Sequence, residues 1–214
     1  MTGTELATGT LDRMRELLPV LAPELRDASG VSPVNQSHDD WLLDIFARST
    51  WTGLGEPGDR VVGVLVRTLG AWPALRLLIS GSDADEVAGA LRESDPSGEL
   101  RVEERDIQTT LTEALERWRP RLSEAEALAH LERGRRIGAQ LVTPGHSDWP
   151  EGLYDLEDHG PVALWTRGDL AVLGSLRRSV SIVGARASTG YGEHVTMEIV
   201  GGLVDRGFAI VSGA

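Results

Sequence analysis

The stretch that decides the fold is SVSIVGARASTGYGEHVTMEIVGGLVDRGFAIVSGA, residues 179–214. The apolar runs from Ser179 to Gly184 and from Phe208 to Ser212 are typical of buried strands, and residues 191–205 between them have the pattern of an amphipathic helix. Strand, helix and strand in this order predict two parallel strands joined by a crossover, as in a Rossmann-like sheet.

Residues 138–178 continue this alternation of short apolar runs and short helices. We expect strands at 140–143 and 162–165, a short helix at 149–156 and a helical turn at 170–173, with all strands paired in parallel. The predicted fold class is therefore α/β, with an incomplete Rossmann-like sheet. It is incomplete because only about 75 residues have the α/β pattern, against roughly 100 or more in a complete domain, and the sequence ends at IVSGA, where such folds place ligand loops.

The sequence before Gly138 has helical periodicity. It predicts an all-helical region with helices at 39–49, 60–69, 75–78, 83–91, 107–118 and 123–137, and a loop at 50–59. Ser123 and Glu126 form an S-x-x-E helix-start signal. We predict three segments: a mobile extension at 1–38 around one helix at 11–25 that Pro19 and Pro23 interrupt, a helical domain at 39–122, and a truncated Rossmann-like domain at 123–214. The tryptophans lie among Leu and Val, so we expect most of them in the core.

The composition excludes several classes of site. The 214 residues contain no cysteine, which rules out disulfides, thiolate zinc sites and cysteine nucleophiles. The five histidines are scattered, so no metal site is expected. The sequence has neither a signal peptide nor a run of about 20 apolar residues, so we expect a cytoplasmic protein without a membrane partner.

The charge distribution is uneven. A net charge of −12 argues against general affinity for nucleic acid. All 21 basic residues are arginines, however, and residues 165–192 contain four of them against one acid, Asp169. An anion site is therefore expected in that segment.

The loop from Gly184 to Gly192 carries the candidate chemistry. A strand that leads through glycines into a helix directs backbone amides and the positive helix end at one point, which suits an anion. Arg186 offers a bidentate phosphate contact, Ser188 and Thr189 offer hydroxyl donors, and Tyr191 offers a stacking ring. The residues alone leave open that the glycines only permit turns and that Arg186 is solvated.

Two known phosphate motifs do not fit this loop. The spacing from Gly184 through Gly190 to Gly192 is G-x5-G-x-G, which differs from the dinucleotide fingerprint G-x-G-x-x-G. A P-loop is excluded because the chain contains no lysine. Arg177 and Arg178 either extend a phosphate track as secondary basic contacts or are a solvated pair.

Residues 181–214 closely resemble the DprA (Smf) family of DNA-processing proteins. That family has the pattern V-G-x-R-x-x-S/T-x-Y-G, then a helix and a strand ending in S-G. Here the pattern is matched by Val183, Gly184, Arg186, Thr189, Tyr191, Gly192, Ser212 and Gly213. LVTPGHSDWPEGL and PVALWTRG resemble upstream elements of the family, and residues 47–70 resemble its degenerate helix-hairpin-helix or SAM-like region.

The resemblance implies a non-enzymatic protein without a cofactor. Such proteins bind single-stranded DNA during natural transformation, protect it and help to load RecA, and the resemblance also implies a homodimer. Carried over to this sequence, Arg186 would contact the DNA backbone, Gly184, Thr189, Tyr191 and Gly192 would shape the pocket, and Ser212 with Gly213 would begin a second phosphate-facing loop.

Three alternatives remain. A phosphoribohydrolase-like enzyme would need a P-G-G-x-G-T-x-x-E element, which these residues lack. A nicotinamide-dependent dehydrogenase is disfavoured by the glycine spacing and by the absence of an acidic residue after FAIVSG. An inactive fragment with an exposed sheet edge is the third alternative.

Overall fold

The computed structural model describes residues 6, 8–22, 38–95, 104–185 and 187–213. They divide into two compact units. The helical unit comprises Met1–His146 and Leu153–Gly168, and the βαβ unit comprises Ser147–Gly152 and Asp169–Ala214. The described structure is mostly helical, with two sheets of two strands each.

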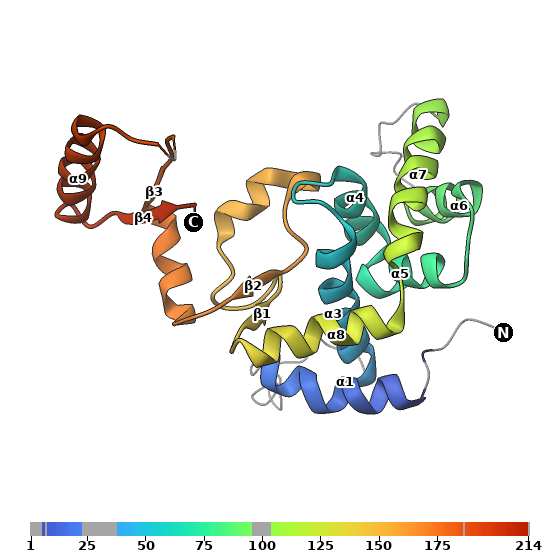
Figure 1. Ribbon diagram of the computed structural model, residues 1–214. Coiled ribbons are helices and arrows are strands. Elements are labelled where there is room, and N and C mark those ends of the chain that lie inside the picture. The colour runs from blue at the N-terminus through green and yellow to red at the C-terminus, as the bar shows by residue number, and fades with distance from the viewer. Residues whose placement is uncertain (1–5, 7, 23–37, 96–103, 186, 214) are drawn as a thin grey trace. The chain divides into compact units, whose positions relative to one another are not determined.

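The helical unit begins with seven described α-helices (Figure 1): α1 (Thr8–Leu21), α3 (His38–Leu54), α4 (Arg60–Leu69), α5 (Ala71–Ile79), α6 (Ala84–Ser94), α7 (Glu104–Trp118) and α8 (Glu124–Arg136). A short 3-10 helix, η1 (Arg119–Arg121), joins α7 to α8. Strands β1 (Gln140–Val142) and β2 (Leu164–Thr166) follow, separated by the 3-10 helix η2 (Glu151–His159).

Side-chain caps fix several helix starts. The Asp59 carboxylate accepts a hydrogen bond from the Val61 amide at 3.0 Å, at the start of α4. Asp83 and Glu86 form a reciprocal capping box on α6. Ser123 Oγ accepts a hydrogen bond from the Glu126 amide at 3.1 Å, which confirms the helix start predicted for α8.

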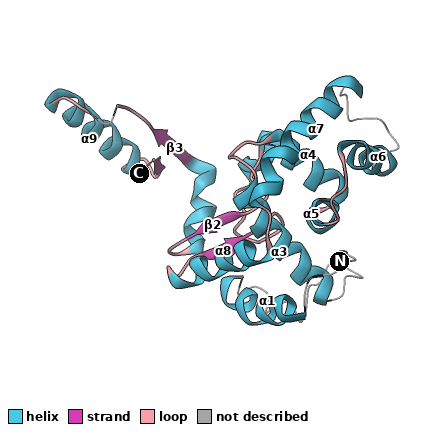
Figure 2. Ribbon diagram, turned by 45° about the vertical axis from the view of Figure 1, so that its right-hand side comes forward, coloured by secondary structure: helices cyan, strands magenta, loops and turns pink. Residues whose placement is uncertain are grey.

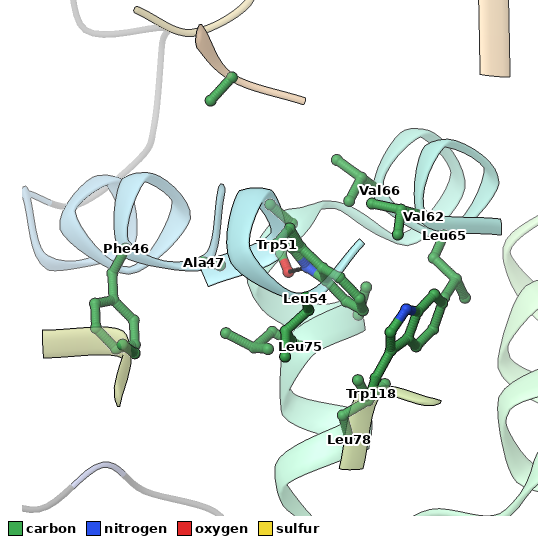
Figure 3. Close-up of a cluster of buried hydrophobic side chains, with 14 of the residues drawn as sticks. Phe46, Ala47, Trp51, Leu54, Val62, Leu65, Val66, Leu75, Leu78 and Trp118 are labelled. Carbon is green, nitrogen blue, oxygen red and sulfur yellow. Dashed lines mark hydrogen bonds between the residues drawn. The ribbon is translucent and has the colours of Figure 1, made fainter. Parts of the chain in front are cut away.

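Two tryptophans occupy the centre of the helical core (Figure 3). The rings of Trp51 from α3 and Trp118 from α7 meet edge to face, with centroids 5.2 Å apart and planes at 80°. The Trp51 indole N–H donates to the carbonyl oxygen of Ala71 at 3.1 Å, so the buried polar group is satisfied. The loop predicted at 50–59 is wrong in its first half, because α3 continues to Leu54 and buries both Trp51 and Leu54.

The segment before residue 39 contributes to this core. Helix α1 buries four apolar side chains in the main cluster, namely Met14, Leu17, Leu18 and Leu21. The described part of the predicted mobile extension is therefore a packed helix. The division predicted at residue 122 also differs from the observed one, because α8, β1 and β2 belong to the helical unit.

Strands β1 and β2 pair antiparallel, with Gln140 opposite Thr166 and Val142 opposite Leu164. The prediction of parallel pairing throughout is wrong for this pair. The physical reason lies in packing: Leu141 joins the helical core, and the Trp165 ring lies against α8 at Gly134. In Figure 2, β2 accordingly lies beside α8.

The βαβ unit contains the 3-10 helix η3 (Leu170–Arg178), strand β3 (Ser179–Ile182), helix α9 (Gly190–Val204) and strand β4 (Ala209–Ser212). Strands β3 and β4 are parallel, which confirms the pairing predicted for them. The predicted burial of both strands is wrong, since no described side chain from Asp169 to Gly213 is buried. A parallel pair becomes fully buried only when layers cover both of its faces, and α9 and η3 leave these strands partly exposed.

Within the described residues, no single helix is long and apolar enough to cross a membrane. Helices α4 and α5 meet the length and composition requirement only as a pair bent by 111°, and both bury side chains in the core.

Candidate nucleic-acid interface

The pairing of β3 with β4 brings two of the predicted loops to one edge of the sheet, which we call the loop edge. Ile182 at the end of β3 lies opposite Ser212 at the end of β4. Because the strands are parallel, the segment beginning at Val183 and Gly184 leaves the sheet beside Gly213. Ligand loops of α/β folds occupy this carboxyl edge, so the sheet places two predicted parts of the site together.

The loop between β3 and α9 is open to solvent. Gly184, Ser188, Thr189 and Tyr191 are all exposed, and Tyr191 is 79% exposed. At the end of β4, Ser212 and Gly213 are exposed as well. Arg186, the predicted phosphate ligand, lies outside the described residues.

The amino end of α9 is capped by the residues predicted to bind phosphate. Thr189 Oγ1 accepts a hydrogen bond from the Gly192 amide at 3.1 Å, and the Thr189 carbonyl accepts one from the Glu193 amide. The amides of Gly190 and Tyr191 have no partner among the described residues. Two amide donors at the positive end of a 15-residue helix are therefore not bonded to any described residue.

Glu193 is a functional candidate that the sequence analysis missed. Its carboxylate accepts a hydrogen bond from Ser188 Oγ at 3.0 Å in the first turn of α9. An anion approaching this helix end would meet a negative charge. An acid three to four residues after a cap is a readable signal, but it indicates a helix start and not a ligand.

The glycines around the loop are not required by the packing of the chain. A Cβ at Gly184, Gly190 or Gly213 would meet no atom within 4 Å, and none of these residues has a positive φ. At Gly192 the nearest atom is Thr189 Oγ1, at an ordinary contact distance of 3.5 Å. The described chain leaves space over the backbone here, as close approach of a ligand requires.

Arg177 and Arg178 lie at the other end of β3. Arg177 Nη2 forms an ion pair with Glu151 Oε2 at 2.6 Å, and the Arg178 guanidinium lies 4.6 Å from the centroid of the Phe208 ring. Both precede the strand, whereas the loop follows it, and a strand of four residues spans about 13 Å. The structure does not bring this arginine pair to the loop edge.

Comparisons with known proteins match this part of the chain. Residues 140–214 match the family model described as DNA recombination-mediator protein A. Two curated sequences named "Putative DNA processing protein DprA", from Mycobacterium tuberculosis strains CDC 1551 / Oshkosh and ATCC 25618 / H37Rv, are each 34% identical over 93 residues. Residues 140–214 are therefore similar to the DprA family. This DprA segment contains β1 to β4, and hence every predicted site residue.

The match is partial on both sides. The alignment to each DprA relative covers 39% of this chain and 24% of the relative, so the chain spans about a quarter of their length. No solved structure gives a significant match. The names of these matches refer to DNA processing and to DNA recombination.

Proposed function

We propose that the chain binds single-stranded DNA at the loop edge of the βαβ unit, which we interpret as part of a Rossmann-like sheet. The observation that carries the proposal is the parallel register of Ile182 with Ser212. It brings the ends of β3 and β4, which lead to Gly184 and Gly213, to one edge of the sheet, next to a helix start with two amides that bond no described residue. The sequence adds Arg186 to the same loop.

The chemistry of this edge suits a phosphate backbone. Amide donors, hydroxyl groups and one arginine hold phosphate oxygens without reading base edges. The exposed Tyr191 ring offers a stacking surface, which any base can use. Since the chain has a net charge of −12, affinity has to come from local contacts and not from the overall field.

The proposed role is non-enzymatic. In it the chain protects single strands during DNA uptake and recombination, with RecA as protein partner and a homodimer as the assembled form. The family of the DprA segment and the matched loop residues support this role.

The glycines at the loop edge give a test with a matched control. We expect Gly184→Ala to weaken binding of a fluorescein-labelled oligothymidylate in fluorescence anisotropy, because a methyl group would occupy the space left for phosphate. Gly201→Ala in α9 also meets no atom within 4 Å and lies away from the loop, so its affinity should stay at the wild-type value. Arg186→Ala should weaken binding and make it less dependent on salt.

Glu193 gives a change in the opposite direction. Glu193→Gln keeps a hydrogen-bond acceptor for Ser188 and removes the negative charge beside the helix start, so affinity should rise. Equal affinity for wild type and all of these variants would discard the site. Absence of binding by wild type would discard the function.

A further inference from the structure

The last turn of α8 presents arginines that the helix does not use as caps. Gly138, with a φ of 66°, closes the helix by backbone bonds alone. The Gly138 amide donates to the Arg135 carbonyl at 3.1 Å, and the Ala139 amide donates to the Gly134 carbonyl at 2.9 Å. The guanidinium groups of Arg135 and Arg136 are therefore not needed at the helix end.

These two side chains form no ion pair and no hydrogen bond with the described part of the chain. Both are exposed, and no described residue forms an ion pair or a hydrogen bond with either guanidinium. The nearest acid in sequence, Glu132, is engaged elsewhere, because its Oε1 lies 2.7 Å from Arg13 Nη2 on α1. That contact is the main reason that the pKa of Glu132 lies below its ordinary value, and the charges of Arg135 and Arg136 lower it further without a direct contact.

The β1–β2 pair adds a third arginine to the same end of the helical unit. Gln140 lies opposite Thr166, so Arg167, the next residue, lies beside Ala139 just after the α8 turn. Arg167 is exposed and has no ion pair with a described residue. We name Arg135, Arg136 and Arg167 the arginine patch.

The surroundings of the patch suit a phosphate backbone. Residues 133–147 and 160–168 contain no aspartate or glutamate, in a chain with 33 acidic residues. Gln140 and Thr166 add polar groups, and Ile137, which is 57% exposed, adds an apolar surface for a base. Guanidinium groups bind phosphate oxygens in bidentate geometry, so three of them track a chain of phosphates.

We propose that the arginine patch is a second contact region for the phosphates of single-stranded DNA, separate from the loop edge of the βαβ unit. This inference rests on the proposed function, because it takes single-stranded DNA as the ligand. It assigns a nucleic-acid role to the helical unit, which the loop site does not involve.

The test uses the salt dependence of binding by the full chain, with the labelled oligothymidylate. Each phosphate contact contributes about 0.7 to the slope of log affinity against log salt. The triple variant Arg135→Gln/Arg136→Gln/Arg167→Gln should therefore lower the slope by about 2 and weaken binding at low salt by roughly tenfold or more. The triple Arg→Lys variant keeps the charges and should retain the wild-type slope.

Two further measurements separate binding from folding. Arg76→Gln removes an exposed α5 arginine that has no partner among the described residues, and should leave the slope unchanged. Thermal unfolding of each variant measures the stability of α8, because arginines at the carboxyl end of a helix also stabilise it through the helix dipole. Arg167→Gln lies outside α8 and leaves that effect intact, and it should lower the slope by about 0.7, so it tests the patch if the triple Gln variant unfolds early.

The outcomes for the patch and for the proposed function are distinct. If wild type does not bind the oligonucleotide, the proposed function fails and the patch proposal fails with it. If wild type binds, Gly184→Ala weakens binding and the triple Gln variant keeps the wild-type slope, only the arginine patch is overturned. A lower slope in the triple Gln variant, with the wild-type slope kept in the triple Lys variant and in Arg76→Gln, supports the patch.

Discussion

Gly63 lies in α4 where the helix passes the backbone of η2. A Cβ at this position would lie 1.8 Å from the carbonyl oxygen of Asp158. Asp158 is held in place, because Arg67 Nη2 lies 2.7 Å from its Oδ1. We expect Gly63→Ala to lower the free energy of unfolding by about 3 kcal/mol, the upper range for overpacking, measured by urea unfolding followed by tryptophan fluorescence.

A second helical glycine provides the control. Gly89 in α6 has no atom within 4 Å of its Cβ position, so Gly89→Ala should raise the free energy of unfolding by about 0.5–1 kcal/mol through helix propensity. A Gly63→Ala variant that unfolds at the wild-type urea concentration would show that α4 does not contact η2 as described.

His130 on α8 makes the stability of the helical unit depend on pH. Its ring lies 5.3 Å from that of Trp165, and burial, with a contribution from Arg133, lowers the pKa of His130. Arg121 and Glu126 line the same cavity of about 270 Å³. The unfolded chain binds the His130 proton more tightly than the folded chain does. The contribution of His130 to the free energy of unfolding is therefore fully present above the ordinary histidine pKa of about 6.5 and is lost as the pH falls below it.

The expected result is a decrease in thermal unfolding temperature between about pH 7.5 and pH 5.5 that is smaller in His130→Gln. Arg13 holds the pKa of Glu132 below its ordinary value, so that carboxyl does not titrate in this range. Parallel pH profiles for wild type and His130→Gln would rule out His130 as the source.

Element boundaries were predictable where the signals are local. The helix predicted at 60–69 has these bounds in the structure, because Asp59 caps its start and Gly70, with a φ of 90°, ends it. The extension of α3 to Leu54 was not predictable from local signals. Gly53 and Gly55 indicate a turn, while burial of Trp51 depends on its contact with Trp118, which lies 67 residues later in the chain.

The pairing of the strands was likewise predictable only where it depends on the local order of elements. Parallel pairing of β3 with β4 follows from the strand–helix–strand order, and it brings the ends of both strands to one edge of the sheet. Antiparallel pairing of β1 with β2 depends on the packing of Trp165 against Gly134, which the strand pattern does not encode. The anionic side chain of Glu193 at the candidate site also emerged only once its bond to Ser188 was visible.

The cap of α9 supports a prediction about that helix. Thr189→Ala removes the acceptor for the Gly192 amide and should lower the stability of α9 by about 1 kcal/mol. Thr196→Ala is the control, because Thr196 bonds back to the Gly192 carbonyl within the helix and alanine favours the helix. Amide hydrogen exchange of α9 measures both, and equal loss of protection in the two variants would contradict the cap.

The two units differ in the driving force for folding. The buried apolar cluster lies in the helical unit, with its largest side chains from α1 and from each helix from α3 to α7. In the βαβ unit, apolar residues such as Met197, Ile199 and Val204 are more than half exposed. Apolar burial is the main favourable contribution to folding, so the helical unit should be the more stable of the two.

This difference predicts two levels of hydrogen-exchange protection. Amides of α3 and α5 should exchange only through global opening of the helical unit, whereas those of α9, β3 and β4 should exchange through local opening with a much smaller free energy. Bound oligothymidylate should slow exchange at β3, β4 and α9 if the loop edge is the binding site, because a ligand stabilises the folded state to which it binds. Exchange in α9 as slow as in α3 without ligand would show that the βαβ unit derives its stability from contacts other than its own half-exposed side chains.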